Sequence, residues 1–187
     1  YDRVLGVNFS VAAFLNIGYD HVSSVEHPTW EDYFASKLRI FEQCTYGLVN
    51  LDSEHCEEIL EAAKASKKVI TFSETNEDAD FYGYNVHKVG NDIVFNVRGS
   101  DFDEEFKLSM PGLFNVSNAL CAIAIARLYD IPVSDIQEGL YQAKVPGRME
   151  IYASNDQKIT AIVDYAHNRL SFQKLFESVR NEYPGYR

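Results

Sequence analysis

The sequence predicts an α/β fold, in which a parallel sheet with flanking helices is joined to a small antiparallel sheet. Two observations lead to this prediction: apolar strand-like runs alternate with helical patterns in the first part of the chain, and the hydrophobic period shortens after residue 78. A β-α-β-α-β order is typical of parallel strands with right-handed crossovers. Its strands and helices are expected at 11–17, 29–43, 46–50, 53–66 and 69–72.

Each of these elements has its own sequence signal. The first run, 11–17, is short, apolar and bounded, as a buried parallel strand requires. Thr29 is the expected N-cap of the first helix, with Asp32 three residues further on. Ser53 is the expected cap of the second helix, in which apolar residues recur at helical spacing.

The shorter period between residues 78 and 109 predicts a three-stranded antiparallel sheet. Its brief apolar runs are separated by turn signals at Gly90-Asn91 and Gly99-Ser100. Further along, the pattern predicts two helices, two short strands that meet at Asn155-Asp156, and a last helix. These five elements are expected at 111–127, 133–142, 149–154, 159–163 and 168–183.

Two of the predicted strands end in polar clusters, where open α/β sheets bind ligands. Asp20 and His21 follow the first strand, and the next helix could bring Lys37, on the same face as Tyr33, back over this strand end. The alternative is a capped surface helix with a solvated lysine. Asp164 follows a later strand; its carboxylate could accept a hydrogen bond from a ribose hydroxyl, or it could simply cap the last helix.

Two asparagines and an arginine add a second group of candidates. Asn115 lies near a helix start and Asn118 follows one turn later, and their amides offer the donors and acceptors that an adenine edge requires. The alternative is that Asn115 only caps the helix. Arg148 follows a hinge-like loop at 144–147, and its fork of donors suits a phosphate or a ribose.

Four motifs in order along the chain resemble the central domain of the Mur ligases, the ATP-dependent amide-bond enzymes of peptidoglycan precursor synthesis. They are Asn-x-x-x-Asp-His at 16–21 with Lys37 on the following helix, Gly-x-x-Asn-x-x-Asn-Ala at 112–119, Pro-Gly-Arg-Met-Glu at 146–150 and Asp-Tyr-Ala-His-Asn at 164–168. The resemblance implies the partial fold of that domain, followed by the start of a Rossmann-like C-terminal domain.

The resemblance also implies ATP and Mg²⁺ as cofactors. In this family the histidine, here His21, binds the second magnesium ion, and the lysine, here Lys37, is carbamylated and helps to position that ion. A carbamate offers oxygen ligands to the cation, whereas an ammonium would repel it. The resemblance assigns binding of the nucleotide to Asn115, Asn118, Arg148, Asp164 and His167.

The reaction implied for the family starts with phosphorylation of a substrate carboxylate by ATP. The amine of the incoming amino acid then attacks the acyl phosphate and releases phosphate. The stretch 21–33 most resembles the members that add the third peptide residue to UDP-N-acetylmuramoyl-L-alanyl-D-glutamate. The expected partners are therefore a UDP-N-acetylmuramoyl peptide and an amino acid, either L-lysine or meso-diaminopimelate. The alternatives are a D-alanyl-D-alanine-adding ligase, folylpolyglutamate or cyanophycin synthetase, and a non-catalytic Mur-like binding domain.

The same resemblance divides the chain into two parts. Residues 1–147 are expected to be the latter part of the central ATP-binding domain, and residues 148–187 the beginning of the C-terminal domain. The sequence has no Gly-x-x-x-x-Gly-Lys-Ser/Thr phosphate loop, which this family keeps upstream of its Asp-His strand. We therefore expect a fragment of a longer enzyme, and no ligase activity from this chain alone.

Composition narrows the classes of partner. The chain has 187 residues, 46% of them hydrophobic, enough for one sizeable core. Its net charge of -11 argues against a nonspecific nucleic-acid partner or an anionic membrane surface. The longest apolar run, 119–126, is too short to span a bilayer, and no signal peptide is apparent. The three cysteines lack metal-ligand spacing and are expected to be reduced, in a cytoplasmic protein.

Overall fold

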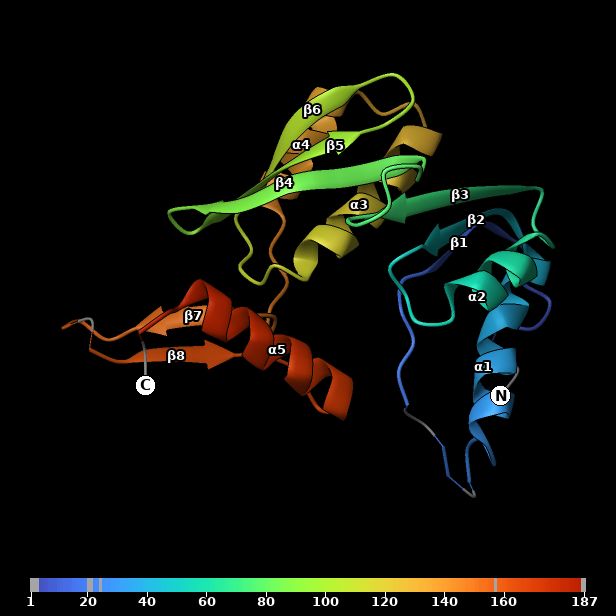
Figure 1. Cartoon of the computed structure of the whole chain (residues 1–187), viewed down its shortest axis with the longest axis horizontal. Coiled ribbons are helices and arrows are strands. Elements are labelled where there is room, and N and C mark those ends of the chain that lie inside the picture. The colour runs from blue at the N-terminus through green and yellow to red at the C-terminus, as the bar shows by residue number, and fades with distance from the viewer. Residues whose placement is uncertain (1–3, 20–21, 24, 157, 186–187) are drawn as a thin grey trace.

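The computed structural model describes residues 4–19, 22–23, 25–156 and 158–185, and it confirms the predicted α/β fold. Within these residues, a mixed six-stranded sheet has the strand order β1-β2-β3-β4-β5-β6, and a second sheet pairs β7 with β8. Figure 1 shows the small sheet and the last helix, α5, at the lower left, beside the large sheet and its helices.

The first three strands form the parallel half of the large sheet. Their side chains alternate between its two faces, as the strand period of two requires. Leu48 packs in the core that contains Leu120 of α3, whereas Val49 packs on the opposite face with Ile59 of α2. The elements of this half are β1 (Phe9–Phe14), α1 (Trp30–Leu38), the 3₁₀ helix η1 (Arg39–Gln43), β2 (Cys44–Asn50), α2 (Cys56–Ala63) and β3 (Lys68–Ser73).

The three antiparallel strands continue the parallel sheet. β4 pairs in parallel with β3 at Phe72–Phe81 and Ser73–Tyr82, and then antiparallel with β5. The predicted antiparallel sheet is thus an extension of the first sheet. The elements of this half are β4 (Phe81–Val89), β5 (Asp92–Arg98), β6 (Asp103–Leu108), α3 (Asn115–Leu128) and α4 (Val133–Gln142).

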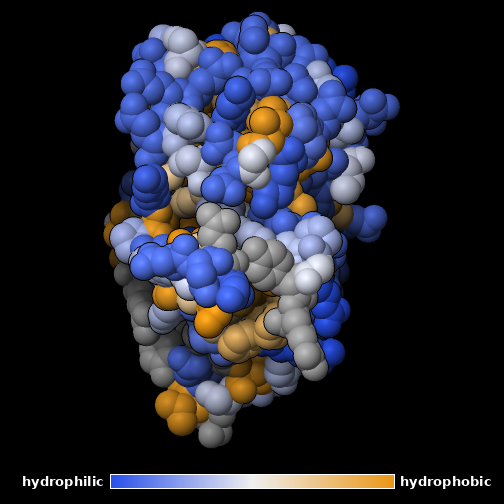
Figure 2. Space-filling view, turned by 90° about the vertical axis from the view of Figure 1, so that its left-hand side faces the viewer, coloured by the Kyte–Doolittle hydropathy of each residue, from blue (hydrophilic) through white to orange (hydrophobic). Residues whose placement is uncertain are grey.

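The C-terminal segment forms a hairpin and a helix close to the predicted positions: β7 (Glu150–Ala153), β8 (Thr160–Val163) and α5 (Arg169–Glu182). Asn168 caps α5 in a reciprocal capping box with Ser171. Figure 2, viewed from the side of the hairpin, shows hydrophobic residues interspersed among hydrophilic ones. Exposed apolar side chains of this segment include Ile151, Ile159, Val163, Phe172 and Phe176.

Three predicted boundaries differ from the structure. Strand 11–17 ends at Phe14, because the carbonyl of Leu15 accepts a hydrogen bond from Asn50 Nδ2 (2.8 Å) as the chain leaves the sheet. The predicted Ser53 cap is wrong: α2 begins at Cys56 after His55, which has φ 61° and makes no side-chain cap hydrogen bond. The predicted helix 29–43 is an α-helix only as far as Leu38, after which the 3₁₀ helix η1 begins.

Two expectations from composition can be compared with the fold. Cys44, Cys56 and Cys121 are free cysteines, and burial raises the pKa of the Cys121 thiol to about 11. None of the helices formed by the described residues combines the length and apolar character that crossing a membrane requires.

The fold predicts opposite effects for two glycine-to-alanine substitutions. A Cβ on Gly47 in β2 would lie 2.9 Å from Ser66 Oγ and 3.0 Å from the Phe41 ring. Because this core is closely packed, Gly47→Ala should lower the free energy of unfolding by about 1–3 kcal/mol. A Cβ on Gly139 in α4 would have no atom within 4 Å. Because alanine favours the helix over glycine, Gly139→Ala should raise the free energy of unfolding by about 0.5–1 kcal/mol. Urea denaturation of both variants tests this pair, and equal effects would contradict it.

Candidate functional site

A pocket of about 120 Å³ lies at the carboxyl end of β1. It joins three segments that are far apart in sequence: the chain just after β1, one residue of α1, and the start of α5. Ligand sites of open α/β sheets lie at this edge. The residues around the pocket are Asn16, Ile17, Gly18, Tyr19, Tyr33, Asn168 and Leu170.

Helix α1 places Lys37 next to Tyr33, a residue of the pocket wall. Thr29 caps the helix as predicted, its side chain accepting a hydrogen bond from the backbone N–H of Asp32 (3.2 Å). Tyr33 is buried and lines the pocket, and the Nζ of exposed Lys37 lies 5.4 Å from its ring centroid. The predicted shared face of Tyr33 and Lys37 is therefore present. Asp20 and His21, the other two candidates of this motif, lie outside the described residues.

The loop before α1 is tied to the start of that helix. His27 Nδ1 lies 2.7 Å from Asp32 Oδ2, and the His27 ring packs on Tyr33 at 5.3 Å between centroids. The backbone N–H of Ser23 donates to the His27 carbonyl (2.9 Å). The position of Tyr33 thus depends on its contacts with the loop as well as on α1.

The two candidate asparagines lie together at the start of α3. Asn115 Nδ2 donates to the Pro111 carbonyl (2.8 Å), and Asn115 Oδ1 accepts from Asn118 Nδ2 (3.1 Å). The alternative that Asn115 only caps the helix is not supported, because Phe114 is the N-cap and Asn115 is the first helical residue. Asn115 is buried while Asn118 is exposed. Among the described residues no hydrogen-bond donor is assigned to Asn118 Oδ1, so that acceptor can meet a ligand.

The remaining candidates gather on the C-terminal segment. The Arg148 guanidinium lies 5.0 Å from the Tyr165 ring centroid, and the His167 ring lies 4.9 Å from the same ring. Asp164 is half-buried and accepts hydrogen bonds from the backbone N–H groups of Met149 (3.0 Å) and Ala166 (2.8 Å). The alternative role of Asp164 as the cap of the last helix is wrong, because Asn168 caps α5.

The candidates therefore form three groups: Lys37 beside Tyr33, the Asn115–Asn118 pair, and the C-terminal residues Arg148, Asp164 and His167. Asn168, the last residue of the Asp-Tyr-Ala-His-Asn motif, lines the same pocket as Asn16 of the first motif. Across the described part of the chain, no cluster of three or more histidine, cysteine, aspartate or glutamate side chains is arranged to hold a metal ion.

Comparison with known proteins identifies the family. The Mur ligase middle domain matches residues 2–126 of this chain. The chain belongs to the Mur ligase family. The pocket residues after β1 and Tyr33 therefore lie in a Mur ligase middle domain, whereas Asn168, Leu170 and Arg148 follow the matched region.

Curated Mur ligases match nearly the whole chain. UDP-N-acetylmuramoyl-L-alanyl-D-glutamate–2,6-diaminopimelate ligase of Clostridium perfringens is 32% identical over 96% of this chain and 37% of its own length. UDP-N-acetylmuramoyl-L-alanyl-D-glutamate–L-lysine ligase of Streptococcus mutans is 35% identical over 98% of this chain and 36% of its own length. The chain thus spans little more than a third of these relatives.

Solved Mur ligase structures share the fold. MurF from Acinetobacter baumannii superposes with a TM-score of 0.79 at 24% identity, covering 91% of this chain and 37% of that chain. MurF ligase from Thermotoga maritima in complex with ADP gives a TM-score of 0.72 at 17% identity, covering 91% of this chain and 38% of that chain. At these identities the likeness supports the fold.

The sequence motifs of this Mur ligase chain did not single out Glu74. It follows β3, and its backbone N–H donates to Asp52 Oδ2 after β2. Burial and the nearby Asp52 carboxylate raise the pKa of Glu74 to about 7, while Lys174 of α5 acts in the opposite direction. The sequence position of Asp52 and Glu74 could have indicated this contact. Each residue follows a predicted parallel strand, and the carboxyl ends of parallel strands meet at one edge of the sheet.

Glu74 should make stability depend on pH. Its folded pKa of about 7 exceeds the ordinary value of 4.5, so its stabilising contribution is present below pH 4.5 and is lost as pH rises to 7. Glutamine does not ionise, so Glu74→Gln should not lose this stability. The difference in unfolding free energy between the variant and wild type should therefore shift in favour of the variant by about 1–3 kcal/mol from pH 5 to pH 8. Urea denaturation at both pH values measures the change. Glu77→Gln, at an exposed position nearby, is the control and should show no such trend.

Proposed function

We propose that the chain is part of an ATP-dependent amide-bond ligase of peptidoglycan precursor synthesis. It would add the third peptide residue to UDP-N-acetylmuramoyl-L-alanyl-D-glutamate. The observation that carries the proposal is the pocket that joins Asn16 after β1 with Asn168 before α5, two residues from separate Mur-like motifs. The names of curated relatives 32–36% identical to this chain support the choice of substrate.

In this proposal the nucleotide is bound by Asn115, Asn118, Arg148, Asp164 and His167. Asn118 presents a free amide oxygen to the adenine edge, and Asn115 fixes the orientation of that amide through their mutual hydrogen bond. Arg148 and His167 are exposed and flank Tyr165, where they can meet phosphate or ribose. The pocket at β1, about 120 Å³, is smaller than common ligand pockets of about 300–1,000 Å³, so it would hold only part of a nucleotide.

The proposed reaction proceeds through an acyl phosphate. The substrate carboxylate attacks the γ-phosphorus of ATP, and ADP leaves. The amine of the incoming amino acid then attacks the acyl carbon, loses a proton and expels phosphate. Donors such as Arg148 would stabilise negative charge that develops on phosphate oxygens during both steps.

Magnesium would supply charge neutralisation at the phosphates when bound. Lys37, as a carbamate, and His21 would hold it in this proposal. An unmodified Lys37 does not fit as a ligand, because its ammonium carries positive charge; the carbamate offers two oxygens, the donor type that Mg²⁺ prefers. The position of Lys37 Nζ over Tyr33, a residue of the pocket wall, is compatible with an oxygen donor directed into that site.

We also propose that residues 1–147 are the latter part of a central ATP-binding domain and that 148–187 begin a C-terminal domain. The apolar side chains exposed on the hairpin and α5 support this division, since a two-stranded sheet with one helix buries too little surface to be stable alone. Further chain would pack on this face, and the loop at 144–147 would act as the hinge. The free thiols agree with the proposed cytoplasmic location.

The test is phosphate release by the full-length protein that contains this chain. MgATP and UDP-N-acetylmuramoyl-L-alanyl-D-glutamate are supplied, and L-lysine or meso-diaminopimelate is added separately. Release that depends on one amino acid is expected and identifies the substrate. The isolated 187-residue chain serves as the control and should show no turnover. Absence of release with either amino acid, with ATP still bound, would contradict the proposed substrate; turnover by the isolated chain would contradict the proposed division into domains.

A further inference from the structure

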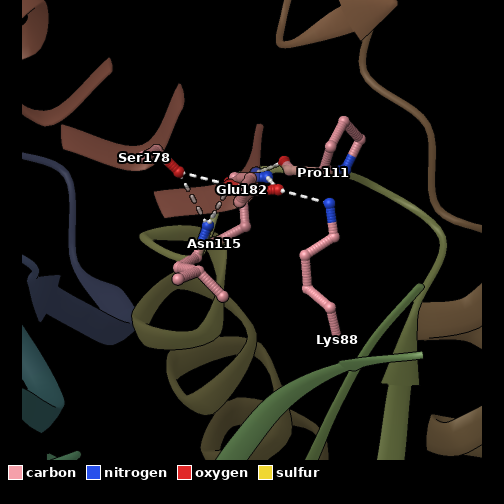
Figure 3. A network of polar contacts seen from close by, with 7 residues as sticks. Lys88, Pro111, Asn115, Ser178 and Glu182 are labelled. Carbon is pink, nitrogen blue, oxygen red and sulfur yellow. Dashed lines mark hydrogen bonds and ion pairs between the residues drawn. The ribbon is translucent and has the colours of Figure 1, made fainter. Parts of the chain in front are cut away.

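A buried carboxylate joins the C-terminal helix to the turn that precedes α3. Glu182 is the last residue of α5, and its side chain is 0% exposed. Figure 3 shows it between α5, the loop at Pro111 and Lys88 of β4. None of the four sequence motifs includes this residue, and the proposed reaction assigns it no role.

The Glu182 carboxylate is fully engaged by its surroundings. Oε1 accepts hydrogen bonds from the Leu113 backbone N–H (3.1 Å) and the Ser178 hydroxyl, and Oε2 accepts one from the Gly112 backbone N–H (3.3 Å). Lys88 Nζ lies 3.3 Å from Oε2. A carboxylate in such a buried place needs partners of this kind. Removal of Glu182 would take the acceptor from the Gly112 N–H, whereas the Leu113 N–H would keep a second acceptor, Ser178 Oγ (3.1 Å).

The turn held by Glu182 is the turn that orients the candidate asparagines. Gly112 has φ +96°, a conformation that favours glycine, and its carbonyl accepts a hydrogen bond from the Asn115 backbone N–H (2.8 Å). The adjacent Pro111 carbonyl accepts from the Asn115 side chain (2.8 Å), which in turn holds Asn118 (3.1 Å). A continuous set of hydrogen bonds thus runs from Glu182 on α5 to the amide of Asn118.

Near its start, α5 also packs against the central part at Gly18. Leu170 approaches Gly18 so closely that a Cβ built there would lie 2.8 Å from Leu170 Cδ2. Phe172 and Phe176 are exposed instead of packing against the large sheet. At the other end of the helix, the attachment includes the charge-assisted contacts of Glu182 and the Lys88 ammonium, which lies 4.8 Å from the Tyr183 ring centroid.

We infer that Glu182 is a positioning residue for base recognition: it allows the Asn115–Asn118 pair to take its ligand-binding orientation only while α5 is docked. This inference rests on the proposed nucleotide site. It makes the C-terminal segment part of the adenine-recognition machinery without contact between Glu182 and the nucleotide.

The experiment compares Glu182→Gln and Glu182→Ala with wild type in the full-length protein. The control is Glu177→Gln, also on α5, where the glutamate is exposed and lies 3.7 Å from Lys174. Binding of ATP, GTP and inorganic triphosphate is measured by calorimetry. Both Glu182 variants should lose about tenfold in the preference for ATP over GTP, with affinity for triphosphate unchanged, because only base recognition is affected. Glu177→Gln should keep the wild-type preference.

Hydrogen exchange at the backbone amides of 112–116 provides a second measurement that needs no nucleotide. Exchange there should be faster in both Glu182 variants than in wild type and Glu177→Gln. An unchanged ATP-to-GTP preference, with or without faster exchange, would overturn the inference, since Glu182 would then be a structural contact only. Failure of the wild type to bind ATP is a different result: it would overturn the proposed function, while faster exchange would still establish that Glu182 fixes the turn.

Discussion

Replacing Lys37 with alanine in the full-length protein should reduce turnover by about 10²–10³-fold, the usual cost of losing a group that stabilises transition-state charge. Nothing in the structure suggests that the loss would come from unfolding. Lys37 is exposed on α1 and contacts the Tyr33 ring at 5.4 Å. Its removal costs one cation–π contact, about 0.5–1 kcal/mol at an exposed site.

Chemical rescue separates the carbamate role from a simple charge role. Formate or acetate should restore part of the turnover of Lys37→Ala, because a small carboxylate can occupy the space of the missing carbamate and offer the same oxygen donors. Lys37→Arg should remain as inactive as Lys37→Ala, since a guanidinium keeps the positive charge and cannot form this carbamate. Lys64→Ala, at an exposed lysine on the surface beyond α2, should turn over like wild type.

Two outcomes would contradict this account of Lys37. Turnover of Lys37→Ala close to that of wild type would remove Lys37 from the site altogether. Wild-type turnover of Lys37→Arg would instead show that a cation suffices at this position, and the lysine would then act on the phosphates directly.

The sequence predicted the parallel half of the fold because its signals are local. Bounded apolar runs identified β2 and β3, and Thr29 marked the start of α1. The end of β1 could not be predicted in this way. It depends on the Asn50 side chain from the neighbouring strand, which takes the Leu15 carbonyl that a longer strand would have given to the sheet. The continuity of the large sheet likewise depends on only two residue pairs between β3 and β4.

The candidate site was likewise only partly predictable from local sequence signals. Motif spacing identified Asn115 and Asn118, and the structure places them in hydrogen-bond contact. The contributions of Glu74 and Glu182 arise from residues distant in sequence, namely Asp52 for the first and Gly112 for the second. A single sequence contains no periodic signal for a carboxylate that becomes buried only when a helix docks.

Substitution of Asp164 should weaken ATP binding, and the hydrogen bonds of its carboxylate decide which substitution tests this best. Both carboxylate oxygens accept backbone N–H groups, from Met149 and Ala166, so Asp164→Ala would also release the start of β7 and the turn after β8. Asp164→Asn is the better variant, because its amide oxygen keeps one of these hydrogen bonds. It should weaken ATP binding by about 10–100-fold, the cost of a hydrogen bond to a charged group.

The comparison that isolates the ribose contact uses a nucleotide that lacks the ribose hydroxyls. If Asp164 accepts from one of them, Asp164→Asn should weaken binding of ATP but leave that of 2′,3′-dideoxy-ATP nearly unchanged, since the analogue never makes the contact. Asp156→Asn is the matched control: its carboxylate also accepts from a backbone N–H, that of Lys158, but it lies in the turn between β7 and β8. An equal loss of affinity for both nucleotides would mean that Asp164 shapes the loop around Tyr165 without touching the ribose.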